Sequence, residues 1–510
     1  MTPWINMEKR MVLAIALSLG VLLIWQVFVP KPQKVAVQDV TTKTSTLNEL
    51  TPSAVTGQVQ SFQPEYDSTI DYNQGNLKVV FYENLAAIKE VIFNQYGNHK
   101  LPLKYGFLLN DPKLEFKKKQ VTEDSISFVA TTSDKRITKK FKFNKSNYTI
   151  DLEINIQNLS SSPLKCDFPL LLGVMDFSAK NIQSRYQDLT LGLQGKTTHV
   201  GIQKDAQLSG VKFLGVRDQY FTAILASEAN DVSGFVKKLN KQEAEIGINV
   251  QTENIQPNSQ IGHLYRIYIG PQDVGILNSI NPEWSAVVYY GMFDIISQVL
   301  LQALGFLYKI VQNWGLAIIL LSILVYLILY PLSIKQMRSM KEMQILQPKV
   351  EELRKANKDN PQKMNKEIME LYKEHKVNPL GGCLPLLLQM PIFFALYQAL
   401  MRSIVLKGAK FLWISDLSEP DRLIRALPIM GMKLDLNILP VIMAVGMFVQ
   451  QKISSASASG AAAEQQKIML IVMPIMFGVI FYGMPSGLVL YWFVNSILML
   501  AFQLRMNRAK

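Results

Sequence analysis

Polar side chains that can hydrogen-bond recur inside the long apolar runs of the C-terminal half. Ser322 and Tyr326 lie four residues apart in one run, and Gln389 lies near the middle of another. Tyr491 and Asn495 lie four residues apart in a third run. A helix places residues four apart on one face, and an unpaired polar group in lipid costs free energy. These residues therefore predict either hydrogen bonds between helices or a water-accessible cavity.

The run over residues 377–401 favours the cavity. Residues 378–400 of this run, NPLGGCLPLLLQMPIFFALYQAL, carry Pro379, Pro385 and Pro391 six residues apart. Each proline removes a backbone hydrogen bond, and such breaks are tolerated at membrane depth where the backbone lines a wet cavity or is buried in protein. We therefore expect Gln389 to face a hydrated groove.

The sequence offers no arrangement of residues that performs catalysis. It contains no glycine-rich phosphate-binding loop, no paired-carboxylate site and no catalytic serine or cysteine arrangement. His99, His199 and His263 are scattered without metal-ligand spacing. Cys166 and Cys383 lie in different regions, so no intramolecular disulfide is expected. We therefore expect no enzyme, no metal site and no cofactor.

The positive charge of the chain is a signal of membrane topology. The net charge is +13 and the mean hydropathy is +0.12. Much of the excess charge flanks apolar runs, which is the pattern that orients membrane spans. No RNA-binding motif is present, and aromatic residues do not alternate with basic ones. We predict a membrane protein with one large water-exposed domain and no specific nucleic-acid sequence as a partner.

The apolar runs predict six spans with both termini in the cytoplasm. Lys9 and Arg10 precede the first run, and Lys335 follows the second. The predicted spans are 11–29, 313–334, 377–401, 434–451, 468–482 and 488–504. The predicted cytoplasmic segments are 1–10, a helical hairpin at 335–376, a loop at 452–467 and a tail at 505–510. The predicted outer segments are a loop at 402–433 and a turn at 483–487. A cleaved signal peptide is the alternative for the first run, and a re-entrant hairpin for residues 468–504.

The region between the first two spans predicts an exported β-domain. Residues 30–64 have the composition of a flexible linker. Residues 65–282 show period-two alternation, as in ITKKFKF and TIDLEINI, which is typical of a large antiparallel sandwich. Residues 283–312 include an amphipathic helix that we place in the membrane interface. A surface helix packed on the exported domain is the alternative.

Three of the last four apolar runs are short. An arm of 15 residues, such as 468–482, reaches only about 22 Å, whereas a hydrocarbon core is about 30 Å thick. Such a mismatch is relieved when the bilayer thins locally or when flanking residues snorkel.

Three motifs resemble one known family. They are LQPKVEELR, the proline-rich run at 378–400, and GMPSGLVLYW, and together with their surroundings they resemble the YidC/Oxa/Alb membrane protein insertases over roughly residues 283–510. The anchor and the large exported domain resemble the Gram-negative YidC form, whose exported domain is a β-supersandwich. The resemblance implies a five-helix insertase core plus an N-terminal anchor helix in the inner membrane of a Gram-negative bacterium.

The resemblance also implies where a client protein passes. A hydrophilic groove, open to the cytoplasm and closed outside, would receive the client's polar part, while the client's apolar helix slides into lipid along the third and fifth spans. The implied groove residues are Ser322, Tyr326, Gln389, Tyr491, Trp492 and Asn495. The implied slide residues are Met390, Pro391, Phe393, Met443, Met447, Met473 and Met476. Flexible thioether side chains suit contact with varied apolar sequences.

One position departs from the family pattern. Many members carry an arginine five residues before the proline that ends the second span, and Tyr326 stands there in this chain. A tyrosine hydrogen-bonds but holds no charge at neutral pH. We therefore expect a groove that is polar rather than cationic, with less preference for acidic translocated segments.

The resemblance implies nascent membrane proteins as substrates and the lipid bilayer as their destination. It also implies the Sec translocon as an occasional partner, and ribosomes or targeting factors at the hairpin 335–376. A secondary transporter or channel is the main alternative, although the sequence contains no inverted repeat and no acidic residue within the spans. A structural chaperone, and a carbohydrate-binding or enzymatic role for the exported domain, are further alternatives.

Overall fold

A computed structural model describes residues 68–508 apart from short segments. The segments left out are 112, 177–187, 194–195, 201–204, 229–231, 251–253, 358–359, 376, 378–383, 430–431 and 455–460. The predicted first span at 11–29 and the linker at 30–64 lie outside the described residues. The chain divides into one compact unit that ends at Val288 and a second that begins at Tyr289.

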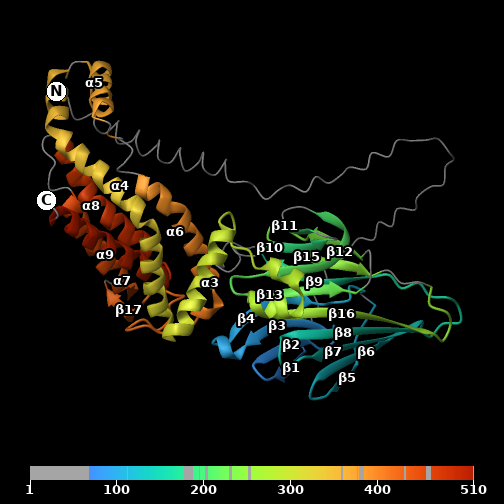
Figure 1. Ribbon diagram of the computed structural model, residues 1–510. Coiled ribbons are helices and arrows are strands. Elements are labelled where there is room, and N and C mark those ends of the chain that lie inside the picture. Colours follow the sequence, from blue (N-terminus) through green and yellow to red (C-terminus); the bar gives the residue numbers. More distant parts are fainter. Residues whose placement is uncertain are drawn as a thin grey trace, which may run out of the picture. The chain divides into compact units, whose positions relative to one another are not determined.

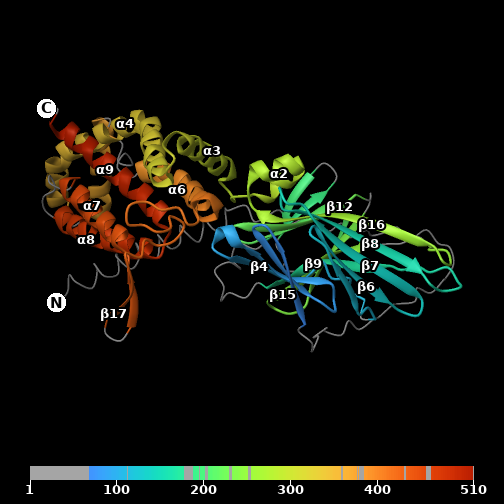
Figure 2. The same cartoon turned by 90° about the horizontal axis from the view of Figure 1, so that it is seen from below.

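The first unit is an all-β sandwich (Figures 1 and 2). One sheet contains, in order, β1 (Thr69–Gln74), β2 (Leu77–Tyr82), β3 (Ala87–Phe93) and β4 (His99–Gly106). The strands of the twelve-stranded sheet are β5 (Lys118–Val121), β6 (Ser125–Thr131), β7 (Lys135–Phe143), β8 (Thr149–Asn158), β9 (Phe168–Asp176), β10 (Asp188–Leu193), β11 (Lys196–Val200), β12 (Ala206–Arg217), β13 (Phe221–Ser227), β14 (Val232–Lys238), β15 (Glu243–Val250) and β16 (Gln260–Pro271). The described residues of this unit also form the short helices η1 (Asn94–Tyr96), α2 (Val274–Ile280) and η3 (Pro282–Val287).

The predicted alternation of apolar residues is present in the sheets. Ile137, Phe141, Leu152 and Ile154 are all fully buried on β7 and β8, whose described neighbours along each strand are mostly more exposed. The two strands pair antiparallel, with Ile137 opposite Ile156. The all-β sandwich predicted for this part of the chain is confirmed.

A buried lysine is the exception to this pattern. Lys139 lies on β7 with no exposed surface, and its ammonium nitrogen donates hydrogen bonds to the carbonyl oxygens of Ala86 and Phe107. Both of these residues have positive φ angles, 46° and 58°. Burial lowers the pKa of Lys139 well below its ordinary value. The lysine therefore holds two turns of unusual backbone conformation against the larger sheet.

The second unit is a helical bundle (Figure 1). Its elements are α3 (Asp294–Val311), α4 (Trp314–Ala356), α5 (Pro361–Glu374), α6 (Leu384–Arg402), η5 (Ile404–Leu406), β17 (Ile424–Ile429), β18 (Met432–Leu436), α7 (Ile438–Ser454), α8 (Ala461–Tyr482) and α9 (Ser486–Arg508). Three described helical segments are long and apolar enough to cross a membrane: Asp294–Val311, Trp314–Ile334 and Ser486–Arg505. Shorter apolar helices cover Ile438–Ile453 and Leu470–Tyr482.

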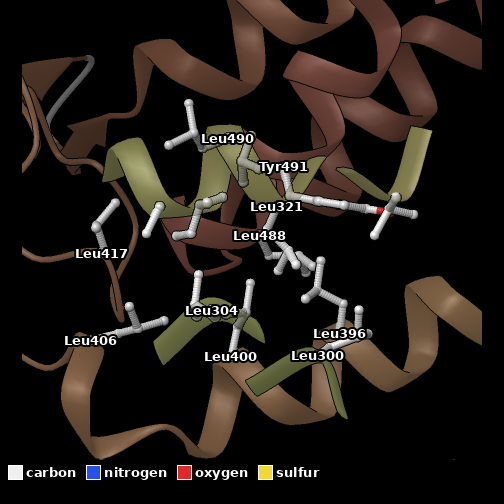
Figure 3. Close-up of a cluster of buried hydrophobic side chains, with 14 of the residues drawn as sticks. Leu300, Leu304, Leu321, Leu396, Leu400, Leu406, Leu417, Leu488, Leu490 and Tyr491 are labelled. Atoms are coloured by element: carbon white, nitrogen blue, oxygen red, sulfur yellow. The ribbon is translucent and has the colours of Figure 1, made fainter. Parts of the chain in front are cut away.

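The helices pack as a chain of neighbours around one apolar core. Helix α3 packs on α4 and α6, α4 on α9, α9 on α7, and α7 on α8. Leu321, Leu396 and Leu488 are buried in the core, which draws on α3, α4, α6, α7, α8, α9 and the loop after α6 (Figure 3). The α-helical membrane core of the predicted fold class is therefore confirmed, with its anchor helix outside the described residues.

Two elements differ from simple expectation. The helix of the predicted second span does not end at Ile334, because α4 continues through Pro331 and Pro348 to Ala356. The helix tolerates both prolines, and the span and the first arm of the hairpin form one element. The predicted outer loop at 402–433 also contains most of an antiparallel hairpin, β17–β18, which projects from the bundle (Figure 2).

Candidate functional site

The hydrogen bond between Gln389 and Tyr491 joins two spans predicted to border the groove. The side-chain amide of Gln389 on α6 donates to the hydroxyl of Tyr491 on α9 at 2.9 Å. Tyr491 is fully buried and forms part of the apolar core, as Figure 3 shows. The structure therefore brings these two predicted residues into direct contact, which is an interhelical bond of the ordinary kind.

Within the described part of the chain, Ser322 makes a local hydrogen bond. Its side chain is completely buried on α4, and its hydroxyl donates to the carbonyl oxygen of Ile318 one turn earlier, at 2.8 Å. A serine that bonds back to its own helix satisfies its donor and leaves its oxygen able to accept one more bond.

Two polar atoms of the predicted groove have no partner within the described residues. They are the hydroxyl oxygen of Tyr326 on α4 and the side-chain amide nitrogen of Asn495 on α9. Both atoms are buried by protein. Buried polar groups are nearly always hydrogen-bonded to protein or to ordered water, so each of these atoms marks a place that suits a water molecule or a client's polar group.

An aromatic cluster lies beside the polar residues and joins α6, α8 and α9. The Phe393 ring centroid lies 5.0 Å from that of Trp492 and 6.0 Å from that of Phe481. Phe477 stacks on Trp492 at 5.5 Å. Sequence reasoning missed Phe477 and Phe481, although their four-residue spacing on α8 places them on one helix face.

The predicted slide residues differ in exposure. Met476 is 41% exposed, whereas Met443 is completely buried in the core. Met447 packs partly buried against the same core. Met390, Pro391 and Met473 are half-buried. Val479, also on α8, is more exposed than any of these residues, at 70%.

Five apolar segments of the bundle contain no Asp, Glu, Lys, Arg or His. These segments are 315–334, 389–401, 438–451, 470–482 and 486–504. Tyr326 stands in the middle of the first segment, with its ring 6.2 Å from that of Tyr330. The polar side chains of these segments are therefore uncharged at neutral pH, and they carry amide, hydroxyl and indole groups.

Family models match both units of the chain. The model described as "60Kd inner membrane protein" matches residues 306–510, and the model described as "YidC periplasmic domain" matches residues 87–303. The membrane protein insertase YidC of Geotalea uraniireducens is 32% identical over 558 aligned residues, which cover 99% of each chain. This chain belongs to the YidC family.

One more curated relative and two solved structures are also similar to this chain. The membrane protein insertase YidC of Syntrophobacter fumaroxidans is 35% identical over 78% of this chain and 72% of its own length. Among solved structures, an active YidC insertase is 21% identical, with a TM-score of 0.41, and the match covers 86% of this chain and 93% of that one. YidC from Thermotoga maritima is 15% identical, with a TM-score of 0.32, over 85% and 99%.

Proposed function

We propose that this YidC family member inserts apolar segments of nascent proteins into the inner membrane and assists their folding. Its relatives, named membrane protein insertases over nearly the whole length of the chain, carry this proposal. No covalent step is needed, because transfer of a long apolar segment into lipid is favourable by itself. The barrier lies in moving the client's polar flanks across the hydrocarbon core.

A hydrated groove between α4, α6 and α9 would lower that barrier. Support comes from Tyr326 and Asn495, whose buried polar atoms have no partner among the described residues. An orphaned buried group costs about 1–3 kcal/mol, and water or a client's backbone would remove that cost. Gln389 and Ser322 add acceptor and donor atoms in the same bundle.

Short helices support local thinning of the bilayer. Helix α7 has 17 residues, which is a length of about 26 Å. The apolar part of α8, Leu470–Tyr482, is shorter still at about 20 Å. Both fall below a hydrocarbon core of about 30 Å, so lipid beside them would be compressed or displaced.

The boundary between α6 and α8 is the proposed exit for the client's apolar helix. Each of these helices packs closely on other neighbours, and aromatic rings link them to each other through Phe393 and Phe481. Exposed Val479 and Met476 continue this surface along α8. A client helix would replace ring contacts here rather than a packed helix interface.

We infer that Tyr326 makes the groove less selective for acidic translocated segments than an arginine would. The Tyr326→Arg variant should raise insertion of clients that carry added Asp or Glu, relative to clients that carry added Ser. Equal insertion of both client types by the variant and the parent would contradict this inference.

The remaining assignments follow the family. We propose that both termini and the hairpin formed by the end of α4 and by α5 lie in the cytoplasm, where the hairpin receives ribosomes or targeting factors. Cooperation with the Sec translocon on some clients is part of the same proposal. Charged residues such as Lys349 and Lys366 on this hairpin fit the cytoplasmic side of the membrane.

Reconstitution tests the function directly. Purified protein in liposomes should insert a single-span client without nucleotide, and photocrosslinkers at Met390, Phe393 and Met473 should capture that client. Solute flux without insertion would instead favour a transporter.

A further inference from the structure

A strained and exposed turn lies at the end of the bundle where α4 begins. Phe411 and Ile414 exchange backbone hydrogen bonds of 2.9 and 2.8 Å, which closes a two-residue hairpin loop. Leu412, the first loop residue, has a φ angle of 51° and is 75% exposed. A positive φ at this place favours glycine, and a bulky apolar residue there is an outlier.

The apolar side chains of this turn point in two directions. Ile414 is buried in the bundle core, and Phe411 packs against that core. Leu412 and Trp413 point outward, with 40% of Trp413 exposed. The indole nitrogen of Trp413 donates to the carboxylate of Asp421 at 3.3 Å. The polar atom of the indole is therefore satisfied by protein, and an apolar face remains outside.

The turn lies beside residues of the kind that gathers at a membrane interface. Phe411 occupies the space beside Gly315, since a β-carbon on Gly315 would lie 2.1 Å from its ring. The turn therefore lies beside the start of α4, where Trp314 stacks on Tyr308 at 3.9 Å. Tryptophan and tyrosine gather where membrane spans meet the interface.

Further residues of the same loop suit phospholipid. Val405 is 38% exposed, and Leu423 and Ile424 are each 43% exposed. Lys407 and Lys410 precede the turn, but Asp416, Glu419 and Asp421 follow it together with Arg422, so residues 405–424 carry no net charge. The exposed apolar side chains, rather than charge, suit a phospholipid surface.

We propose that Leu412 and Trp413 form a membrane anchor that inserts into the leaflet at this end of the bundle and fixes the depth of the bundle there. The unfavourable φ of Leu412 persists because glycine at this place would provide no apolar side chain for lipid. The proposed occupant is phospholipid rather than protein, because the turn lies beside the start of the apolar segment of α4, where Leu316 is 45% exposed. This anchor does not depend on the proposed groove.

Spin-label depth measurements on the full chain test the anchor. In a variant with Cys166 and Cys383 replaced by serine, a nitroxide at Leu412→Cys is reconstituted in vesicles of phosphatidylethanolamine and phosphatidylglycerol. Labels at Lys145→Cys in the sandwich and Val479→Cys on α8 give the aqueous and lipid references. We expect the label at 412 to be several-fold less accessible to a water-soluble nickel reagent than the label at 145, and accessible to oxygen.

Two other outcomes of this experiment would overturn the proposal. If the label at 412 were as accessible to the nickel reagent as the label at 145, the turn would lie in water. Exclusion of both nickel and oxygen would show a turn covered by protein, either another copy or a partner. Client insertion is not part of the readout, so failure here is separate from failure of the proposed function.

A strain-relieving variant gives a second, independent test. Leu412→Gly removes both the unfavourable conformation and the apolar side chain. We expect its midpoint of thermal unfolding to be equal to or above that of the parent in detergent, and below it in vesicles. A drop of the same size in both media would mean that Leu412 acts through protein packing, and the proposal would be wrong.

Discussion

The Tyr326→Phe variant tests whether water reaches the polar residues of the bundle. Its ring is kept and only the hydroxyl is lost, so packing against Tyr330 at 6.2 Å is retained. In the structure the hydroxyl oxygen is buried, and it has no partner within the described residues. The sign of the stability change therefore depends on what surrounds this oxygen.

The two possibilities differ by a measurable free energy. If the oxygen is dry, it costs about 1–3 kcal/mol as an unpaired polar atom, and the phenylalanine variant should be more stable by that amount. If water bonds to it, the variant loses a modest interaction and should be less stable by zero to about 1 kcal/mol. A hydrated groove predicts the second result. The lost interaction should also slow insertion of polar-flanked clients by roughly three- to five-fold.

The assay is reversible unfolding in bicelles, compared with insertion in liposomes. Tyr330→Phe is the matched control, since Tyr330 lies one turn further along α4 and its ring packs on Phe502 at 5.1 Å. This control should leave insertion unchanged. Stabilisation of Tyr326→Phe by more than 1 kcal/mol would show a dry site and refute the reasoning.

Three further changes have definite expected outcomes. Gln389→Leu leaves the buried hydroxyl of Tyr491 without its donor, so the free energy of unfolding in bicelles should fall by about 1–3 kcal/mol. Gly315→Ala places a β-carbon 2.1 Å from Phe411, and should cost about 1–3 kcal/mol by the same measurement, with partial recovery when Phe411→Leu is added. Burial lowers the pKa of Lys139 in the folded state. Between that lowered pKa and about 10.4, the unfolded state binds more protons than the folded state, so the free energy of unfolding rises with pH. Denaturation of the exported domain in the full chain should show this rise, up to about 1.4 kcal/mol per pH unit, and Lys139→Met should remove it.

The sequence predicted elements whose hydrophobic pattern is local and repeated. Alternation around Ile137 and Leu152 identified strands, because one face of each strand is buried. The start of α5 at Pro361 follows from Asn360, whose side-chain oxygen accepts a hydrogen bond from the backbone N–H of Lys363 as an N-cap. Such signals lie within a few residues of the feature they determine.

Features that depend on tertiary contact were missed. Lys139 has the pattern of an exposed strand residue, and only the carbonyl groups of Ala86 and Phe107 make its burial possible. The hydrogen bond between Gln389 and Tyr491 could not be predicted from a local pattern, because 102 positions separate the two residues in the sequence. Proline usually ends a helix, yet α4 continues through Pro331 and Pro348.

Access of water to Asn495 tests the central claim most directly. A cysteine at position 495 in an otherwise cysteine-free chain would be treated in vesicles with a membrane-impermeant thiol reagent, with Val479→Cys on the exposed face of α8 as the lipid-facing control. We predict modification at 495 and none at 479, with protection of 495 when a client segment occupies the groove. Equal resistance of the two positions to the reagent would contradict a hydrated groove.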